Sequence, residues 1–72
     1  MKTNLNGMPG RIRAARELSG KTKKELAEET YCNKCTVANM ECGRTIPNVD
    51  TLARICDALD VTMQWIVYGG TE

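Results

Sequence analysis

Two helix-start signals lying close together, at Thr22 and Asn33, constrain the fold of this chain more than any other feature. Glu25 follows Thr22 at the third position, the pattern of a capping box in which each side chain bonds the other residue's backbone N–H. Asn33 is a second good N-cap residue, and Gly43 can adopt the left-handed conformation that ends a helix. The stretch from Thr22 to Arg44 therefore predicts two short helices joined by a tight turn.

The clearest amphipathic pattern in the chain lies between Asn48, another N-cap residue, and Asp60, which is placed to end a helix in a left-handed conformation. Apolar residues recur there at i, i+3, i+4 and i+7, namely Leu52, Ile55, Cys56 and Leu59. This spacing predicts a helix at the centre of the core, and Thr62 predicts a last short helix after it. Because the sequence has no Phe, one Trp and two Tyr, the core must be filled by Leu, Ile, Val, Met, Ala and Cys, and we expect an all-α bundle.

A first helix is predicted from about Pro9 to the stop at Gly20. Its inward stripe at helical spacing comprises Ile12, Ala15, Arg16 and Ser19, with Leu18 beside it. A lone arginine on a buried face is costly unless it is paired. Glu41 shares the inward face of the helix after Asn33, so we predict a partly buried Arg16–Glu41 salt bridge; the alternative is that both reach solvent.

A chain of 72 residues forms one small domain. We assign residues 1–8 to a flexible arm, residues 9–68 to the domain and residues 69–72 to a tail. No apolar run approaches the roughly 20 residues that span a bilayer, and the start of the chain lacks the apolar segment of a signal peptide. The expected location is therefore the cytoplasm, with no membrane partner.

The charges are unevenly distributed along the chain, although the net charge is only +1. Residues 1–44 contain nine Lys and Arg against five acids, whereas residues 45–72 contain Arg54 against four acids. Such an asymmetry allows one side of a small domain to face phosphates. A solvated basic face without any partner is the alternative that charge alone leaves open.

The order of these elements and a set of spaced residues can be compared with known families. The set comprises Leu26-Ala27, Thr36-Val37, Glu41 before Gly43, Pro47, Leu52, Ala58-Leu59, and Val61-Thr62 before Trp65. With this set, the chain from about Pro9 to Trp65 resembles the lambda-repressor-like (phage repressor, Cro and Xre-like) family of helix-turn-helix DNA-binding domains. The resemblance implies a compact five-helix bundle, in which helix 2 crosses the DNA backbone and helix 3, about Asn33–Cys42, lies in the major groove.

The resemblance also implies which residues meet double-stranded DNA. Base contacts are expected from Lys34, Cys35, Ala38 and Asn39. Phosphate contacts are expected from Thr22, Lys23, Thr36 and Arg44, although the Thr36 hydroxyl could instead satisfy the end of its own helix. The Arg16–Glu41 pair matches a paired position in phage repressors. The family commonly has glycine where Tyr31 stands, so the turn before helix 3 is expected to be wider or strained.

Four cysteines, Cys32, Cys35, Cys42 and Cys56, invite a zinc or redox hypothesis, because CxxC spacing can place two thiolates on one metal. Cys32 and Cys56 fall on predicted inward faces, whereas Cys35 and Cys42 point outward, so the four do not converge. We therefore expect no metal site and no cofactor. No histidine is present, the acids follow solvent-facing positions, and an enzyme is not expected.

The sequence thus predicts a sequence-specific DNA-binding transcription regulator, and more specifically a repressor. We expect it to act as a homodimer, because one small domain makes too few contacts with DNA for tight binding. The resemblance places the dimer surface near Ile46, Pro47, Thr62 and Met63. There are four alternatives to a repressor: a transcription activator, an antitoxin, a protein-interaction module with the same fold, and a thiol or metal sensor.

Overall fold

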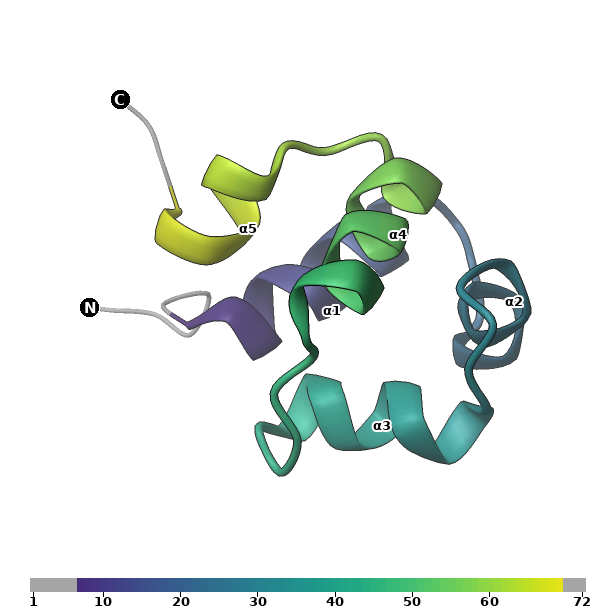
Figure 1. Ribbon diagram of the computed structural model, residues 1–72. Helices are drawn as coiled ribbons and strands as arrows, with labels where there is room; N and C mark the ends of the chain where they lie inside the picture. The colour runs from purple at the N-terminus through teal and green to yellow at the C-terminus, as the bar shows by residue number, and fades with distance from the viewer. Residues whose placement is uncertain (1–6, 70–72) are drawn as a thin grey trace.

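The computed structural model describes residues 7–69, and these residues form five α-helices without a β-strand (Figure 1). The helices are α1 (Met8–Leu18), α2 (Lys23–Glu29), α3 (Lys34–Cys42), α4 (Val49–Leu59) and α5 (Met63–Tyr68). The predicted all-α fold is therefore confirmed. Of the predicted arm and tail, all but Gly7, Met8 and Gly69 lie outside the described residues.

Side-chain caps begin four of the five helices where the sequence predicted them. Thr22 and Glu25 form the capping box: the Glu25 N–H donates to Thr22 Oγ1 at 3.1 Å, and the Thr22 N–H donates to Glu25 Oε1 at 2.8 Å. The other three caps each accept a backbone N–H at the third helical position, and they are Asn33, Asn48 and Thr62. Each cap satisfies an N–H group that has no partner within its helix, so the helix bounds follow local chemistry.

The first helix has nearly the predicted bounds, with Pro9 in its first turn and the left-handed Gly20, at φ of 73°, just after its C-cap. It begins at Met8, one residue before Pro9, because Gly7 takes the extended N-cap conformation. Leu18 is 86% exposed and Ser19, the C-cap residue, is also exposed. Placing these two on or beside the buried stripe was wrong, because the helix ends at Leu18 before the next turn can reach the core.

Arg11 is a buried residue of α1 whose burial was not predicted. Its Nε donates to the Ile66 carbonyl at 2.8 Å, and its Nη2 donates to the Val67 carbonyl at 2.8 Å. These carbonyls lie in the last turn of α5, where C=O groups have no N–H partner within the helix. The guanidinium also leaves no space for a side chain at Gly69, where an added Cβ would lie 2.8 Å from Arg11 Nη1. Arg11 thus fastens the short helix α5 to α1.

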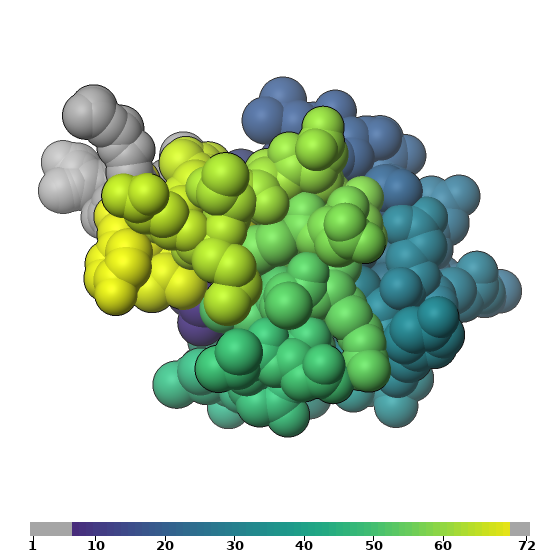
Figure 2. Space-filling view, turned by 45° about the horizontal axis from the view of Figure 1, so that its top comes forward, coloured from purple at the N-terminus to yellow at the C-terminus, as the bar shows by residue number. Residues whose placement is uncertain are grey.

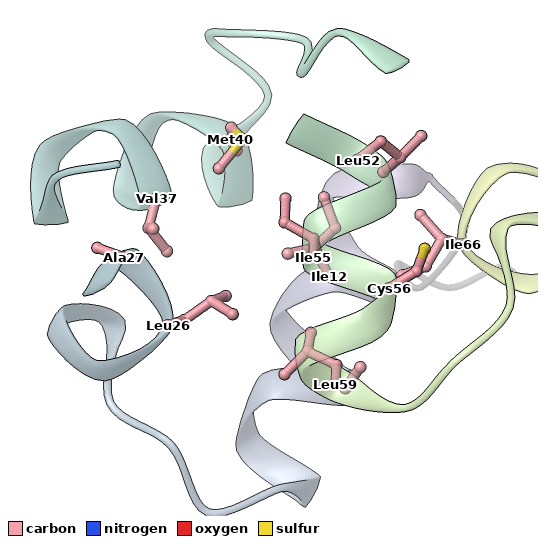
Figure 3. Packing of buried hydrophobic residues seen from close by; sticks show 11 residues of the cluster. Ile12, Leu26, Ala27, Val37, Met40, Leu52, Ile55, Cys56, Leu59 and Ile66 are labelled. Atoms are coloured by element: carbon pink, nitrogen blue, oxygen red, sulfur yellow. The ribbon is translucent and has the colours of Figure 1, made fainter. Parts of the chain in front are cut away.

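The core draws side chains from all five helices (Figure 3). The predicted stripe of α4, Leu52, Ile55, Cys56 and Leu59, is buried, and Ile12, Leu26, Val37, Met40 and Ile66 meet it from the other helices. Trp65 is half-buried and packs on this cluster. Within the described residues, every buried side-chain nitrogen and oxygen has a hydrogen-bond partner.

The helices form a domain measuring 31 × 24 × 21 Å, with α2 and α5 on opposite sides of α4 (Figures 1 and 2). Helix α3 lies along one border of the bundle, held mainly by α2 and α1. One long side of α3 is thereby left uncovered. No helix within residues 7–69 is long and apolar enough to cross a membrane.

Candidate nucleic-acid interface

The orientation of α3 is fixed by its buried side. Val37 and Met40 are almost completely buried against the other helices. Gly43, with φ of 84°, ends the helix in the left-handed conformation, and its N–H donates to the Met40 carbonyl at 3.3 Å. The Arg44 N–H then donates to the Asn39 carbonyl at 2.9 Å and turns the chain away from the helix axis. The opposite side of α3 faces solvent.

The four residues predicted to contact bases lie on or beside this solvent side. Lys34 and Cys35, in the first turn, are exposed, and Ala38 and Asn39, in the second turn, are half-buried. Cys42 extends the same side by another turn and is exposed, and its thiol donates to the Ala38 carbonyl at an S···O distance of 2.9 Å. The structure therefore gathers a narrow surface of small and polar side chains, with Lys34 as its only charge.

The four residues predicted to contact phosphate differ in the hydrogen bonds that their side chains make within the protein. Within residues 7–69, the side chains of Lys23 and Arg44 have no hydrogen bond or ion pair. Thr22 Oγ1 accepts the Glu25 N–H, which leaves its own proton available. Thr36 Oγ1 donates to Asn33 Oδ1 at 3.1 Å, the oxygen that also caps α3. The geometry thus assigns the Thr36 hydroxyl to its helix end, the alternative noted for it.

The Arg16–Glu41 salt bridge joins α1 to α3. Arg16 Nε donates to Glu41 Oε2 at 2.6 Å and Nη2 donates to Oε1 at 3.1 Å, a bidentate pair, while Nη1 donates to the Lys21 carbonyl at 2.8 Å. The Glu41 side chain is only 4% exposed. The hydrogen bonds that Arg16 donates to Glu41 raise the pKa of Arg16, although burial opposes this shift, so the guanidinium stays charged. The predicted pair is present, and it fixes the rotation of α3 against the bundle.

A hollow opens beside this pair, where three helices meet. It is lined by Arg13 of α1, Lys23 of α2, and Ala38, Glu41 and Cys42 of α3. Its volume is about 230 Å³. Arg13 was not predicted as part of the site, because its helical position marks it only as solvent-facing. Its spacing of three residues from Arg16 was the one available signal that it lies near α3.

The cysteines occupy the expected sides of their elements. Cys56 is buried, and burial raises the pKa of its thiol. Cys32 is half-buried, and Cys35 and Cys42 are exposed on α3. Within residues 7–69, no three His, Cys, Asp or Glu side chains gather as a metal site would require.

Both the sequence and the fold of this chain are similar to those of known helix-turn-helix proteins. A family model described as helix-turn-helix matches residues 12–66, which is most of the chain. No curated protein sequence matched. The fold is similar to that of the P22 c2 repressor in complex with the synthetic operator 9T, with a TM-score of 0.86 and 23% identity, covering 89% of this chain and 97% of the repressor.

Two other solved structures are nearly as similar. The master regulator for biofilm formation SinR, in complex with DNA, has a TM-score of 0.77 and 25% identity, with 82% of this chain and 95% of SinR covered. The restriction-modification controller protein C.AhdI from Aeromonas hydrophila has a TM-score of 0.79 and 21% identity, with coverages of 86% and 94%. These identities are low, so the structural likeness supports the fold.

Proposed function

The chain belongs to the helix-turn-helix family, and on this premise we propose that it is a sequence-specific DNA-binding transcription regulator that inserts α3 into the major groove. One observation carries the proposal: α3 is anchored through Val37, Met40 and Glu41, yet its other side is uncovered. An α-helix with side chains is about 10–12 Å across, and the major groove is about 12 Å wide. A helix uncovered along one side can therefore enter the groove.

The polar residues of this surface suit base edges. Lys34 can donate to guanine O6 or N7, and Asn39 can make a paired contact with adenine N6 and N7. Cys35 and Ala38 offer small apolar surfaces and suit the C5-methyl group of thymine. These four side chains give the protein two strong hydrogen-bonding readers per half-site, so its sequence preference rests mainly on Lys34 and Asn39.

Phosphate contacts fix the position of the helix. We assign them to Lys23 and Arg44, whose side chains extend from α2 and from the segment after α3, and to the hydroxyl proton of Thr22. Thr36 joins this set only if its hydroxyl rotates away from Asn33 Oδ1, to which it donates in the structure. The helix cap would remain in that case, because it is the Thr36 N–H that caps α3 by donating to Asn33 Oδ1.

We further propose that the protein binds DNA as a homodimer and represses transcription by occupying its site. A single domain of this size makes too few contacts for tight binding to one site among a genome of competitors. The segment between α3 and α4 exposes Ile46, and the first turn of α4 exposes Val49. Met63, at the start of α5, is also partly exposed. Pro47 and Thr62 complete the predicted dimer surface, and burying these apolar groups would favour association.

Selection of bound sites from a random duplex pool tests the proposal. The Lys34→Ala and Asn39→Ala variants should each relax preference at one position per half-site. The Arg44→Ala variant should weaken binding to all sequences alike and reduce the dependence of affinity on salt concentration. Absence of DNA binding by the wild type at low salt would contradict the proposal, and it would favour a protein-interaction module that keeps this fold.

A further inference from the structure

We propose that the hollow between α1, α2 and α3 seats a phosphodiester group of the DNA backbone, and that Arg13 of α1 binds this phosphate together with Lys23. The inference rests on the DNA-binding function proposed above and extends it. It adds a third helix to the interface, and it places a phosphate beside α3 at the turn that carries Ala38 and Cys42.

The size and lining of the hollow suit such a group. Its volume of about 230 Å³ would hold several water molecules, each of which takes up about 30 Å³ in the liquid. Arg13 and Lys23 approach it from different helices, so an anion between them would meet a cation on two sides. Arginine can bind two phosphate oxygens at once through its planar guanidinium, whereas lysine acts as a point charge.

The one carboxylate in the lining does not cancel these cations. Glu41 is held in a bidentate contact by Arg16 at 2.6 and 3.1 Å, and its side chain is only 4% exposed. Arg16 therefore compensates the charge of Glu41 within the protein. No carboxylate of the lining therefore compensates Arg13 or Lys23, and the salt-bridge partner of Arg13, Glu17, is not part of the lining.

Arg13 can leave its present partner at small cost. Its Nε lies 3.1 Å from Glu17 Oε2, one turn further along α1, and the two side chains are 64% and 54% exposed. Exposed pairs at this spacing contribute little to stability, because solvent screens the two charges. A phosphate in the hollow would offer Arg13 a contact at least as favourable.

The hollow lies where a phosphate would pass. Ala38 and Cys42 belong both to its lining and to the uncovered side of α3. When a helix fills the major groove, the two sugar-phosphate backbones run along its flanks. A backbone on the α1 side of α3 therefore passes over the hollow, and its phosphate meets Arg13 and Lys23.

A pair of matched arginine variants tests the assignment. Arg54 of α4 is also exposed and pairs with an acid one turn away, Asp50 at 3.0 Å, so Arg54→Gln removes the same charge from a similar pair outside the hollow, together with a contact on the Tyr31 ring. Arg13→Gln should weaken binding to random duplex by about tenfold and lower the salt slope by about one. It should leave the selected sequence unchanged, and Arg54→Gln should have little effect. Equal losses in the two variants would overturn the proposal.

Alkylation of the cysteines, followed residue by residue by mass spectrometry, gives a second readout in the unaltered protein. Cys42 lines the hollow and Cys35 lies on α3 outside it, and both are exposed. Saturating duplex at low salt should slow iodoacetamide labelling at both positions. Protection of Cys35 without protection of Cys42 would mean that α3 is bound while the hollow is empty, which overturns the inference alone. Protection of neither would overturn the DNA-binding function itself.

Discussion

At the scale of single residues, Tyr31 shows a local conflict between side chain and backbone. Its φ is 59°, a left-handed conformation that costs a non-glycine residue about 1–2 kcal/mol. The turn between α2 and α3 requires it, because the Cys32 N–H must reach back to the Ala27 carbonyl at 2.9 Å. Tyr31 is 82% exposed as a residue, and the guanidinium carbon of Arg54 lies over its ring, 5.2 Å from the ring centroid. The strained turn expected from the sequence is therefore present.

Replacing Tyr31 separates the backbone strain from the ring contact. Tyr31→Ala keeps the strain and loses the stacking on Arg54, so it should lower stability slightly. Tyr31→Gly also loses the stacking but removes the strain, and it should be about 1 kcal/mol more stable than Tyr31→Ala. Urea unfolding of the two variants measures the difference. Equal midpoints would show that the left-handed conformation carries no cost here.

Cys56 makes a prediction about pH. Its side chain is buried, and burial raises the pKa of the thiol above its ordinary value of 9.0 because the thiolate would lose its hydration. The folded state therefore holds this proton more tightly than the unfolded state does. The contribution of Cys56 to stability is complete below about pH 9 and falls as pH rises toward the folded pKa, by up to about 1.4 kcal/mol per pH unit.

The Cys56→Ala variant isolates this effect from the titration of other groups. It should be less stable than the wild type at neutral pH because it leaves a small cavity. The difference between the two proteins should then shrink as pH rises above about 9, in reducing buffer, when followed by urea unfolding. A difference that stays constant with pH would refute the linkage to this thiol.

At the scale of the helix, Asn33 and Asn48 provide the same cap at two functionally different places. The Asn33 side chain accepts the Thr36 N–H and the Asn48 side chain accepts the Thr51 N–H, both at 2.8 Å. Substitution of either by alanine should cost about 1 kcal/mol of folding free energy, measured by urea unfolding. Only Asn33→Ala should also weaken DNA binding, because the first turn of α3 carries Lys34 and Cys35. Equal DNA affinities in the two variants would argue against α3 as the reading helix.

Helix-level features also show how far the sequence can predict the fold. Caps and hydrophobic periodicity act within a few residues, so the starts of α2 to α5 and the buried stripe of α4 could be predicted. Arg11 could not, because its acceptors, Ile66 and Val67, lie more than 50 residues away and are backbone carbonyls. Every residue has a backbone carbonyl, so the sequence does not indicate which carbonyls accept these hydrogen bonds.

The candidate site likewise has one part that could be predicted from the sequence and one part that only the structure shows. The uncovered side of α3 follows from helical spacing and from the family resemblance, so Lys34, Cys35, Ala38 and Asn39 could be assigned in advance. The hollow depends on how α1, α2 and α3 pack together, and only the structure brings Arg13 to Lys23. Pairing of Arg16 with Glu41 was predictable because an inward charge on one helix requires an inward partner on another.

At the scale of the whole molecule, charge and shape both bear on how the domain meets DNA. The basic residues of the proposed interface lie within residues 1–44, and the acids of residues 45–72 lie mostly on α4 and the segment that follows it. Repulsion between these acids and phosphates disfavours approach through α4. The domain should therefore reach DNA already oriented with α3 toward the duplex.

The dimensions of the domain set a limit on how two copies can bind. The longest extent is 31 Å, slightly less than the roughly 34 Å between half-sites one helical turn apart. Two copies related by a two-fold axis can therefore lie side by side on one face of the duplex, close enough for their exposed apolar residues to touch. A dimer of this kind requires the half-sites to keep one spacing.

Changing that spacing tests the dimer separately from base reading. Inserting about five base pairs, half a helical turn, between two selected half-sites turns one of them to the opposite face of the duplex. The affinity should fall to that of a single half-site, because the second copy can no longer bind DNA and its partner together. The same insertion outside the half-sites should have no effect. Unchanged affinity in an electrophoretic titration would mean that the two copies bind independently, and the exposed Ile46 and Val49 would then require a different partner.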